Sequence, residues 1–162
     1  MPSREWGRLT VQEAAIIREH QNVIPVPLAP IARELGVEVK ASTLAPGISG
    51  ELRPTADGFV IRVNRHDPRV RQRFTVAHEL AHFLLHRDHI GNGIEDDVLY
   101  RSELSDQREA EANRLAADIL MPEERVREAF AAARGLDNQE VGVNLANQFG
   151  VSEAAMRIRL GL

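Results

Sequence analysis

The sequence predicts an α+β fold in which a small antiparallel sheet packs on a bundle of helices. Strand-like segments at residues 37–40, 48–53 and 59–64 lie close together in the chain, and the last alternates apolar and polar side chains. Apolar residues recur at helical spacing before and after these segments. The length of 162 residues, 43% of them hydrophobic and 27% charged, suits one compact domain, or one domain with a small helical appendage.

Helices are expected on both sides of the strands. Gly36 ends the second helix in a left-handed conformation, Asp67 and Pro68 start the third, and Ser105 caps the fourth. The expected helices cover residues 10–21, 30–35, 67–86, 105–120, 122–134, 139–149 and 152–160.

The sequence also predicts the connections between these elements. Asp57-Gly58 predicts a two-residue hairpin turn between the second and third strands. Residues 87–104 are polar and contain two glycines, so an irregular segment is expected there. Residues 1–121 are interpreted as the core. Residues 122–162 are interpreted as a helical extension packed on it, whose last two helices have helix-turn-helix spacing.

Composition excludes several classes of site and partner. The chain has no cysteine, which excludes disulfides, cysteine-bound zinc and thiol catalysis, so any metal must be held by histidine and carboxylate. A net charge of −4, from 20 basic and 24 acidic residues, gives no overall basic field for nucleic acid. No apolar run approaches the roughly 20 residues that span a bilayer. We therefore expect a soluble cytoplasmic protein without a membrane partner.

The segment His78-Glu79-Leu80-Ala81-His82 predicts a metal site on the third helix. Residues four apart project from one face of a helix, so His78 and His82 can ligate a single Zn²⁺ ion. Glu79 lies about 100 degrees round the helix, beside the ion and not on it. That position suits a general base for the attacking water.

A catalytic zinc needs a third protein ligand and an open position. A straight helix separates His86 from His78 by about 12 Å, which disfavours His86 as that ligand. Glu109 is a better candidate for the third ligand. Asn113, one helical turn later, could orient a ligand histidine. Glu111 is expected to point into solvent. The candidates considered are His86, His89, Glu103, Asp106, Glu109 and Glu111.

Longer strings around the motif resemble the ImmA/IrrE family of metallopeptidases. They are residues 71–86 (RQRFTVAHELAHFLLH), residues 109–122 (EAEANRLAADILMP), the hairpin entry Ile48-Ser49-Gly50, and the tail that begins at Phe149-Gly150-Val151-Ser152. The bare zinc motif occurs in many families, but these extended strings and the Met-Pro ending are specific. The resemblance covers nearly the whole chain.

The resemblance implies a reduced zincin fold with His78, His82 and Glu109 as zinc ligands and Glu79 as the catalytic base. Asn113 falls where related enzymes keep a residue that supports a ligand. The family typically cleaves a helix-turn-helix repressor, which derepresses genes of mobile elements, DNA-damage responses or phage defence. Single-stranded DNA is an activating signal that this resemblance suggests.

Two other functions stay open at this point. The last two helices could bind DNA, although the second offers only Arg157 and Arg159 as basic residues, against Glu153. The chain could also be a metal protein that binds a partner without catalysis. Tyr100 is a candidate donor to the oxyanion of the reaction, with a buried loop anchor as its ordinary role.

Overall fold

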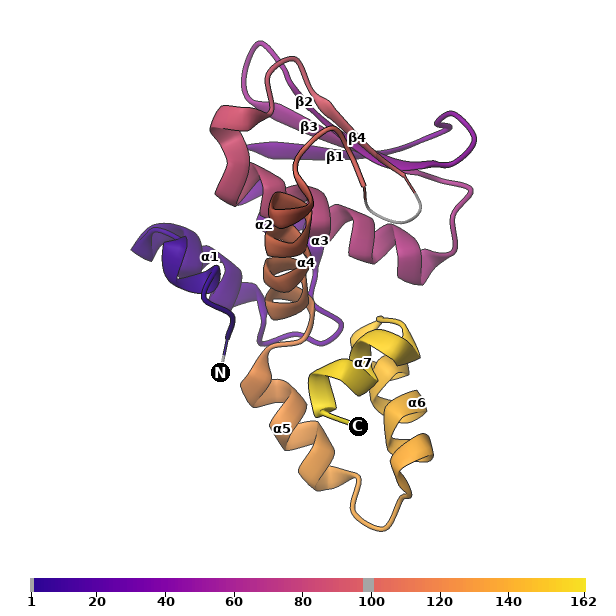
Figure 1. Cartoon of the computed structure of the whole chain (residues 1–162). Helices are drawn as coiled ribbons and strands as arrows, with labels where there is room; N and C mark the ends of the chain where they lie inside the picture. Colours follow the sequence, from indigo (N-terminus) through magenta and orange to yellow (C-terminus); the bar gives the residue numbers. More distant parts are fainter. Residues whose placement is uncertain (1, 98–100) are drawn as a thin grey trace.

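A computed structural model describes residues 2–97 and 101–162. It has a sheet at one end, helices α3 and α4 beneath it, and three C-terminal helices at the other end (Figure 1). The helices are α1 (Val11–His20), α2 (Leu28–Glu34), α3 (Arg69–His86), α4 (Asp106–Leu120), α5 (Glu123–Ala132), α6 (Asn138–Phe149) and α7 (Glu153–Leu160), with short 3₁₀ turns η1 (Trp6–Arg8) and η2 (Arg87–His89). The strands are β1 (Val37–Ser42), β2 (Ile48–Pro54), β3 (Phe59–Asn64) and β4 (Ile94–Asp97).

The α+β class predicted from the sequence is confirmed, but the sheet is mixed and not antiparallel. Its strand order is β1-β3-β2-β4, with β1 parallel to β3 and β2 antiparallel to both of its neighbours. β1 and β2 are consecutive in the chain but are not neighbours in the sheet. The hairpin that follows β2 places β3 between them. Alternation of side chains gives the faces of a strand and does not specify the direction of its neighbour.

The hairpin between β2 and β3 forms as expected, with its turn displaced by one residue. The backbone N–H of Thr55 donates to the carbonyl oxygen of Gly58 at 2.8 Å, so Ala56 and Asp57 form the centre of the turn. The register pairs Pro54 with Phe59.

The expectation of an irregular segment at residues 87–104 is wrong in part, because β4 forms within it. Three of its four residues are acidic, and acidic residues are depleted in strands. The strand forms because it pairs with β2, whose edge would otherwise present unpaired backbone groups. β4 is consequently the edge strand on the side of the candidate site.

Helix α3 forms the centre of the core, in contact with β2, β3 and α4. Its buried residues include Ala77, Leu80 and Ala81, which pack with Leu115 and Ile119 of α4 in one hydrophobic cluster. The start of α4 is secured by the Ser105 hydroxyl, which accepts a hydrogen bond from the Arg108 backbone N–H. These two packed helices form a rigid base for the side chains between them and the sheet.

The C-terminal helices join the same hydrophobic cluster, through residues that include Leu145, Phe149 and Met156. Helix α6 ends at Gly150 in a left-handed conformation, and the Ser152 side chain caps α7. The spacing of α6 and α7 is therefore the one predicted. None of the helices in the described residues is long and apolar enough to cross a membrane.

Candidate metal centre

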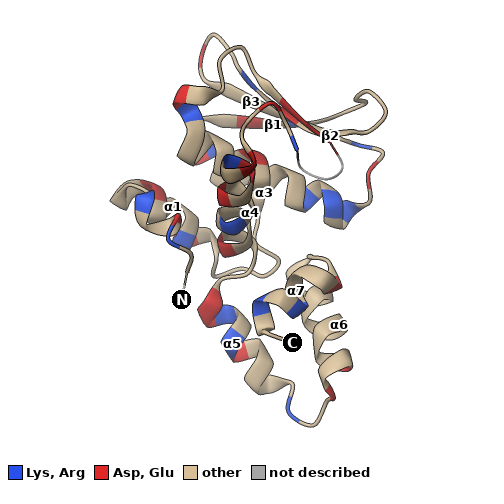
Figure 2. Ribbon diagram, viewed as in Figure 1, with Lys and Arg blue, Asp and Glu red and all other residues tan. Residues whose placement is uncertain are grey.

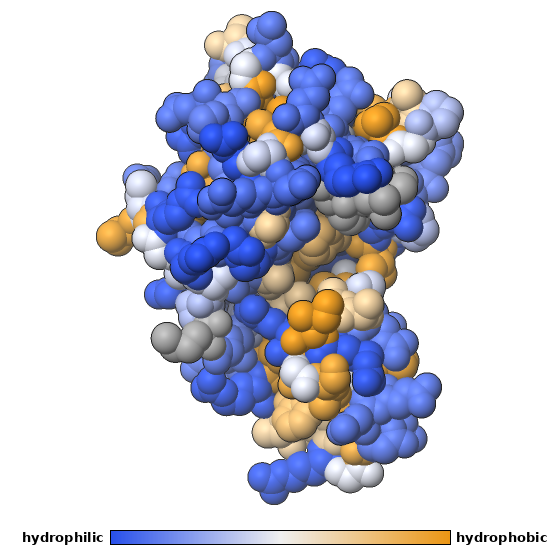
Figure 3. Space-filling model, in the orientation of Figure 1, coloured by the Kyte–Doolittle hydropathy of each residue, from blue (hydrophilic) through white to orange (hydrophobic). Residues whose placement is uncertain are grey.

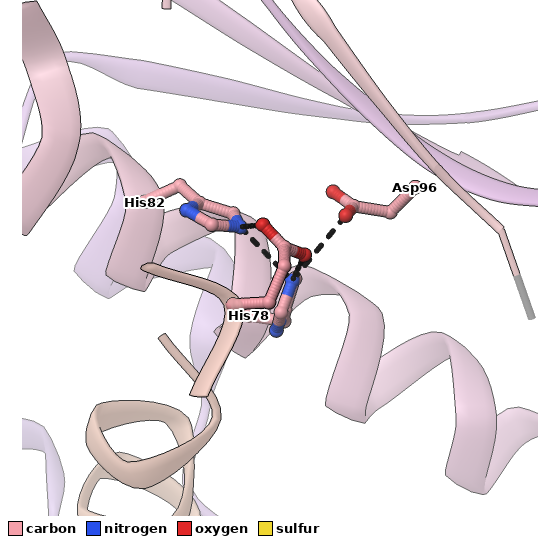
Figure 4. A group of neighbouring side chains, drawn as sticks. His78, His82 and Asp96 are labelled. Atoms are coloured by element: carbon pink, nitrogen blue, oxygen red, sulfur yellow. Dashed lines mark hydrogen bonds and ion pairs between the residues drawn. The ribbon is translucent and has the colours of Figure 1, made fainter. Parts of the chain in front are cut away.

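The two histidines of the motif lie on one face of α3, as a spacing of four residues requires. The side chains of His78 and His82 have no exposed surface, and their Nε2 atoms are 3.0 Å apart. Figure 4 shows the two imidazoles below the strand that carries Asp96. Helix α3 therefore brings two nitrogen donors to one buried position.

Glu109 of α4 brings a carboxylate to the same position. Its Oε1 lies 3.2 Å from His78 Nε2, and its Oε2 lies 2.9 Å from His82 Nε2. The Ser102 hydroxyl donates to Oε2 at 3.1 Å. Burial alone would raise the pKa of Glu109, but its hydrogen bonds to the histidines outweigh burial and hold the pKa well below the usual range.

Asp96 of β4 is the site residue that sequence reasoning missed. Its side chain is fully buried, and its Oδ1 lies 3.5 Å from His78 Nε2 (Figure 4). Neither of its oxygens accepts a hydrogen bond from the residues that the structure describes. In β4, Ile94 and Asp96 face inward and Glu95 faces outward, an orientation that the run of acidic residues does not reveal in the sequence.

Hydrogen bonds behind the two imidazoles set their orientation. Asn113 Oδ1 lies 2.8 Å from His78 Nδ1, and His86 Nδ1 lies 2.9 Å from His82 Nδ1. When each Nδ1 donates its proton backward, each neutral Nε2 presents a lone pair to the cluster. In that tautomer, both histidines can bind a metal through Nε2.

His86 lies outside the donor cluster and connects it to α4. Its Nε2 is 2.8 Å from Glu111 Oε1, and Glu111 also pairs with Arg8 at 3.3 Å. The expectation that Glu111 points into solvent is therefore wrong. Its partners come from α3 and η1, which are far from α4 in the sequence, so helix geometry alone could not reveal them.

Glu79 lies beside the cluster, fully buried. Neither of its oxygens has a hydrogen-bond partner among the described residues. Burial, reinforced by the Asp96 and Glu109 carboxylates, raises the pKa of Glu79 well above its usual range. Gly50 of β2 leaves room for it: a Cβ there would lie 3.2 Å from Glu79 Oε2 and 2.4 Å from Thr75 Cγ2.

The donor set fits a divalent cation. One atom from each of His78, His82, Asp96 and Glu109 lies within 4.8 Å of all the others. Four ligands about 2.0–2.1 Å from a tetrahedral zinc lie about 3.3 Å from one another, close to the measured separations of 2.9–3.5 Å. Two facing lone pairs and two carboxylates repel one another unless a cation or protons lie between them. The Asp96 and Glu109 carboxylates outweigh burial, which opposes them, and raise the pKa of His78 to about 9.

The remaining candidates from the sequence lie elsewhere. The donor group found among residues 2–97 and 101–162 does not include His89, Glu103 or Asp106. His89 Nε2 instead lies 3.3 Å from Arg108 Nη2 at the surface. Tyr100, the candidate oxyanion donor, lies outside the described residues.

A histidine pair on one helix, a carboxylate on the next and a buried glutamate beside them define an α+β domain with a candidate metal centre. The chain belongs to the family of IrrE N-terminal-like domains, peptidase family M78, whose model matches residues 32–161. The resemblance predicted from the sequence is thus confirmed. The family assignment makes this centre the candidate active site of a peptidase.

A comparison with solved structures supports the fold. The chain is similar to a Mycobacterium tuberculosis transcriptional regulator, with a TM-score of 0.61, 19% sequence identity and 99% of this chain covered. The chain spans about half of that protein, 48% of its length. A search of curated proteins finds no significant match.

Proposed function

We propose that the protein is a zinc-dependent endopeptidase. The observation that carries this proposal is Glu79, a buried carboxylate without a hydrogen-bond partner among the described residues, beside two histidines and Glu109. A site that only held a metal would have no use for a glutamate that is costly to bury. Membership of an M78 peptidase family supports the same reading.

His78, His82 and Glu109 are the residues that would hold the ion. Zinc bound there supplies a Lewis acid that makes a water molecule more acidic and polarises the scissile carbonyl. Glu79 accepts the proton of the attacking water and transfers it to the leaving amine. Asn113 and His86 keep the imidazoles oriented through the hydrogen bonds to their Nδ1 atoms.

The proposed substrate is a helix-turn-helix repressor protein. An extended segment of it would pair with the edge strand β4, which lies next to the donor cluster. Cleavage would derepress stress, mobile-element or phage-defence genes, and a repressor substrate implies a cytoplasmic reaction. Single-stranded DNA is the proposed activating signal. The substrate class and the signal both follow from the family resemblance.

The test is incubation of the full chain with a helix-turn-helix repressor from a neighbouring gene, followed by mass spectrometry to locate a cut. Wild type should cleave, a chelator should stop cleavage, and Glu79→Gln should bind zinc without cleaving. Exposed Glu19→Gln on α1 is the matched control and should behave as wild type. Cleavage by Glu79→Gln at the wild-type rate would refute the proposal.

DNA binding by the last two helices is the weaker alternative. The Arg159 guanidinium donates to Asp118 Oδ1 at 3.1 Å and to the Met121 carbonyl at 2.8 Å, so it is engaged with α4. On α7, Ile158 is 81% exposed, and apolar side chains gather over the C-terminal helices (Figure 3). Figure 2 shows both signs of charge on α5–α7 and no continuous basic face in that view. Salt-dependent retention of the full chain on duplex DNA would support this alternative.

A further inference from the structure

We propose that Asp96 is the fourth protein ligand of the metal in the resting protein. The centre would then be closed until β4 withdraws Asp96. This inference rests on the proposed zinc site and adds to it a built-in inhibitory contact.

The position of Asp96 in the sheet directs it at the donor cluster. In the register of β2 and β4, Asp96 lies opposite Gly50, the glycine that leaves room for Glu79. Its neighbours on the strand point the other way, since Glu95 is 48% exposed and Asp97 is 33% exposed. Of the three consecutive acidic residues, only Asp96 faces the histidines.

The distance between Asp96 and His78 fits the ligation of one shared ion. Asp96 Oδ1 lies 3.5 Å from His78 Nε2, near the separation of about 3.3 Å expected for two ligands of one tetrahedral zinc. Both Asp96 oxygens lack a hydrogen-bond partner among the described residues, and the side chain has no exposed surface. A buried carboxylate in that state needs a cation to balance its charge.

Ligation by Asp96 would give the centre four protein ligands. Structural zinc sites have four, whereas a catalytic zinc keeps one position open for water or substrate. The proposed base, Glu79, is fully buried, so the described conformation offers a peptide no access to it. Both features describe an inactive state.

The strand that carries Asp96 is the one most easily displaced. β4 has four residues and pairs with β2 only, because it is the edge of the sheet. Its register with β2 is irregular between Ile48 and Gly50. The other three ligand candidates lie on α3 and α4, which pack against each other in the core. Withdrawal of Asp96 would therefore leave three ligands in place and open the fourth position.

The test uses the full chain loaded with Co²⁺, whose visible absorption reports the coordination of the ion, and azide as a small anionic ligand. The variant is Asp96→Asn, and its matched control is Asp97→Asn, on the same strand and facing outward. Azide should leave the spectrum of wild type and of the control unchanged and should alter that of Asp96→Asn. The zinc dissociation constant of Asp96→Asn should rise at least about tenfold.

Stability provides a second measurement that a merely structural aspartate would not satisfy. Without metal, Asp96→Asn should unfold at a lower temperature than wild type at pH 7, because it removes the carboxylate that pairs with His78. With zinc, it should gain less stability than wild type. A gain in stability from zinc equal to that of wild type would overturn the inference.

Two outcomes separate this inference from the proposed function. If wild type binds Co²⁺ and its spectrum responds to azide as that of Asp96→Asn does, Asp96 is not a ligand and the three-ligand centre stands. If wild type binds neither Co²⁺ nor zinc, the proposed zinc site itself is refuted, and this inference with it.

Discussion

Replacement of Gly50 by alanine tests how closely β2 approaches the metal-bearing helix. Gly50 pairs with Val63 of β3, and its α-carbon faces α3. An alanine Cβ would lie 2.4 Å from Thr75 Cγ2 and 3.2 Å from Glu79 Oε2. Carbon atoms in favourable contact lie about 3.5–4.0 Å apart, so Thr75 or the strand must move by about 1 Å.

A displacement of Thr75 or of the strand costs folding free energy in any direction. Thr75 is fully buried on α3, and a β-branched side chain in a helix has few rotamers to choose from. Overpacking of this kind costs about 1–3 kcal/mol of folding free energy. Glu79 lies one helical turn beyond Thr75. A displacement of about 1 Å at the base could lower the rate of a catalysed reaction about 10²-fold.

Denaturant unfolding of metal-free and zinc-loaded Gly50→Ala, together with the cleavage assay, measures both effects. The control is Gly7→Ala, where a Cβ would meet nothing within 4 Å. Adding Thr75→Ser to Gly50→Ala removes the clashing methyl group and should recover most of the lost stability. If Gly50→Ala unfolds within about 0.5 kcal/mol of the control, the close approach is not as described.

Two further predictions concern the histidines. His86→Leu removes the hydrogen-bond partner of His82 Nδ1 and should raise the zinc dissociation constant about 10–100-fold. A competition assay with a chromogenic chelator measures this constant. An unchanged constant would mean that His86 does not orient His82. The pKa of His78 is raised from 6.5 to about 9, so zinc must displace a proton at neutral pH, and its apparent affinity should rise about tenfold per pH unit from 7 to 8.5 and level off above 9. A flat profile of zinc affinity against pH, measured by calorimetry, would contradict this assignment. The raised pKa of His78 also stabilises the metal-free protein. This stabilisation is complete below pH 6.5 and is lost as the pH rises through 9.

Local signals in the sequence predict the helices well. Caps at Thr10, Ser105 and Ser152 accept hydrogen bonds from their own first turns, as their residue types indicate. The four-residue spacing of His78 and His82 was enough to place both side chains on one face. Such features depend on neighbours within one or two turns of the chain, so one sequence is sufficient to read them.

Features that depend on contacts between distant parts of the chain could not be predicted from the sequence. The direction of β1 depends on where β3 inserts, and alternation within each strand is the same for either direction. Asp96 stands in a run of acidic residues that indicates a solvated loop, and it becomes a site residue only because β4 pairs with β2. Glu111 is engaged because Arg8, about a hundred positions earlier in the sequence, lies beside it.

The acidic character of β4 has a consequence for self-association. An exposed sheet edge can pair with the same edge of a second molecule, and that pairing begins aggregation. In β4, pairing of two copies would bring the outward-facing carboxylates of Glu95 and Asp97 close to those of the other molecule. Like charges directly opposite each other destabilise a strand pair. The acidic side chains of β4 thereby protect this edge against pairing with another copy of itself.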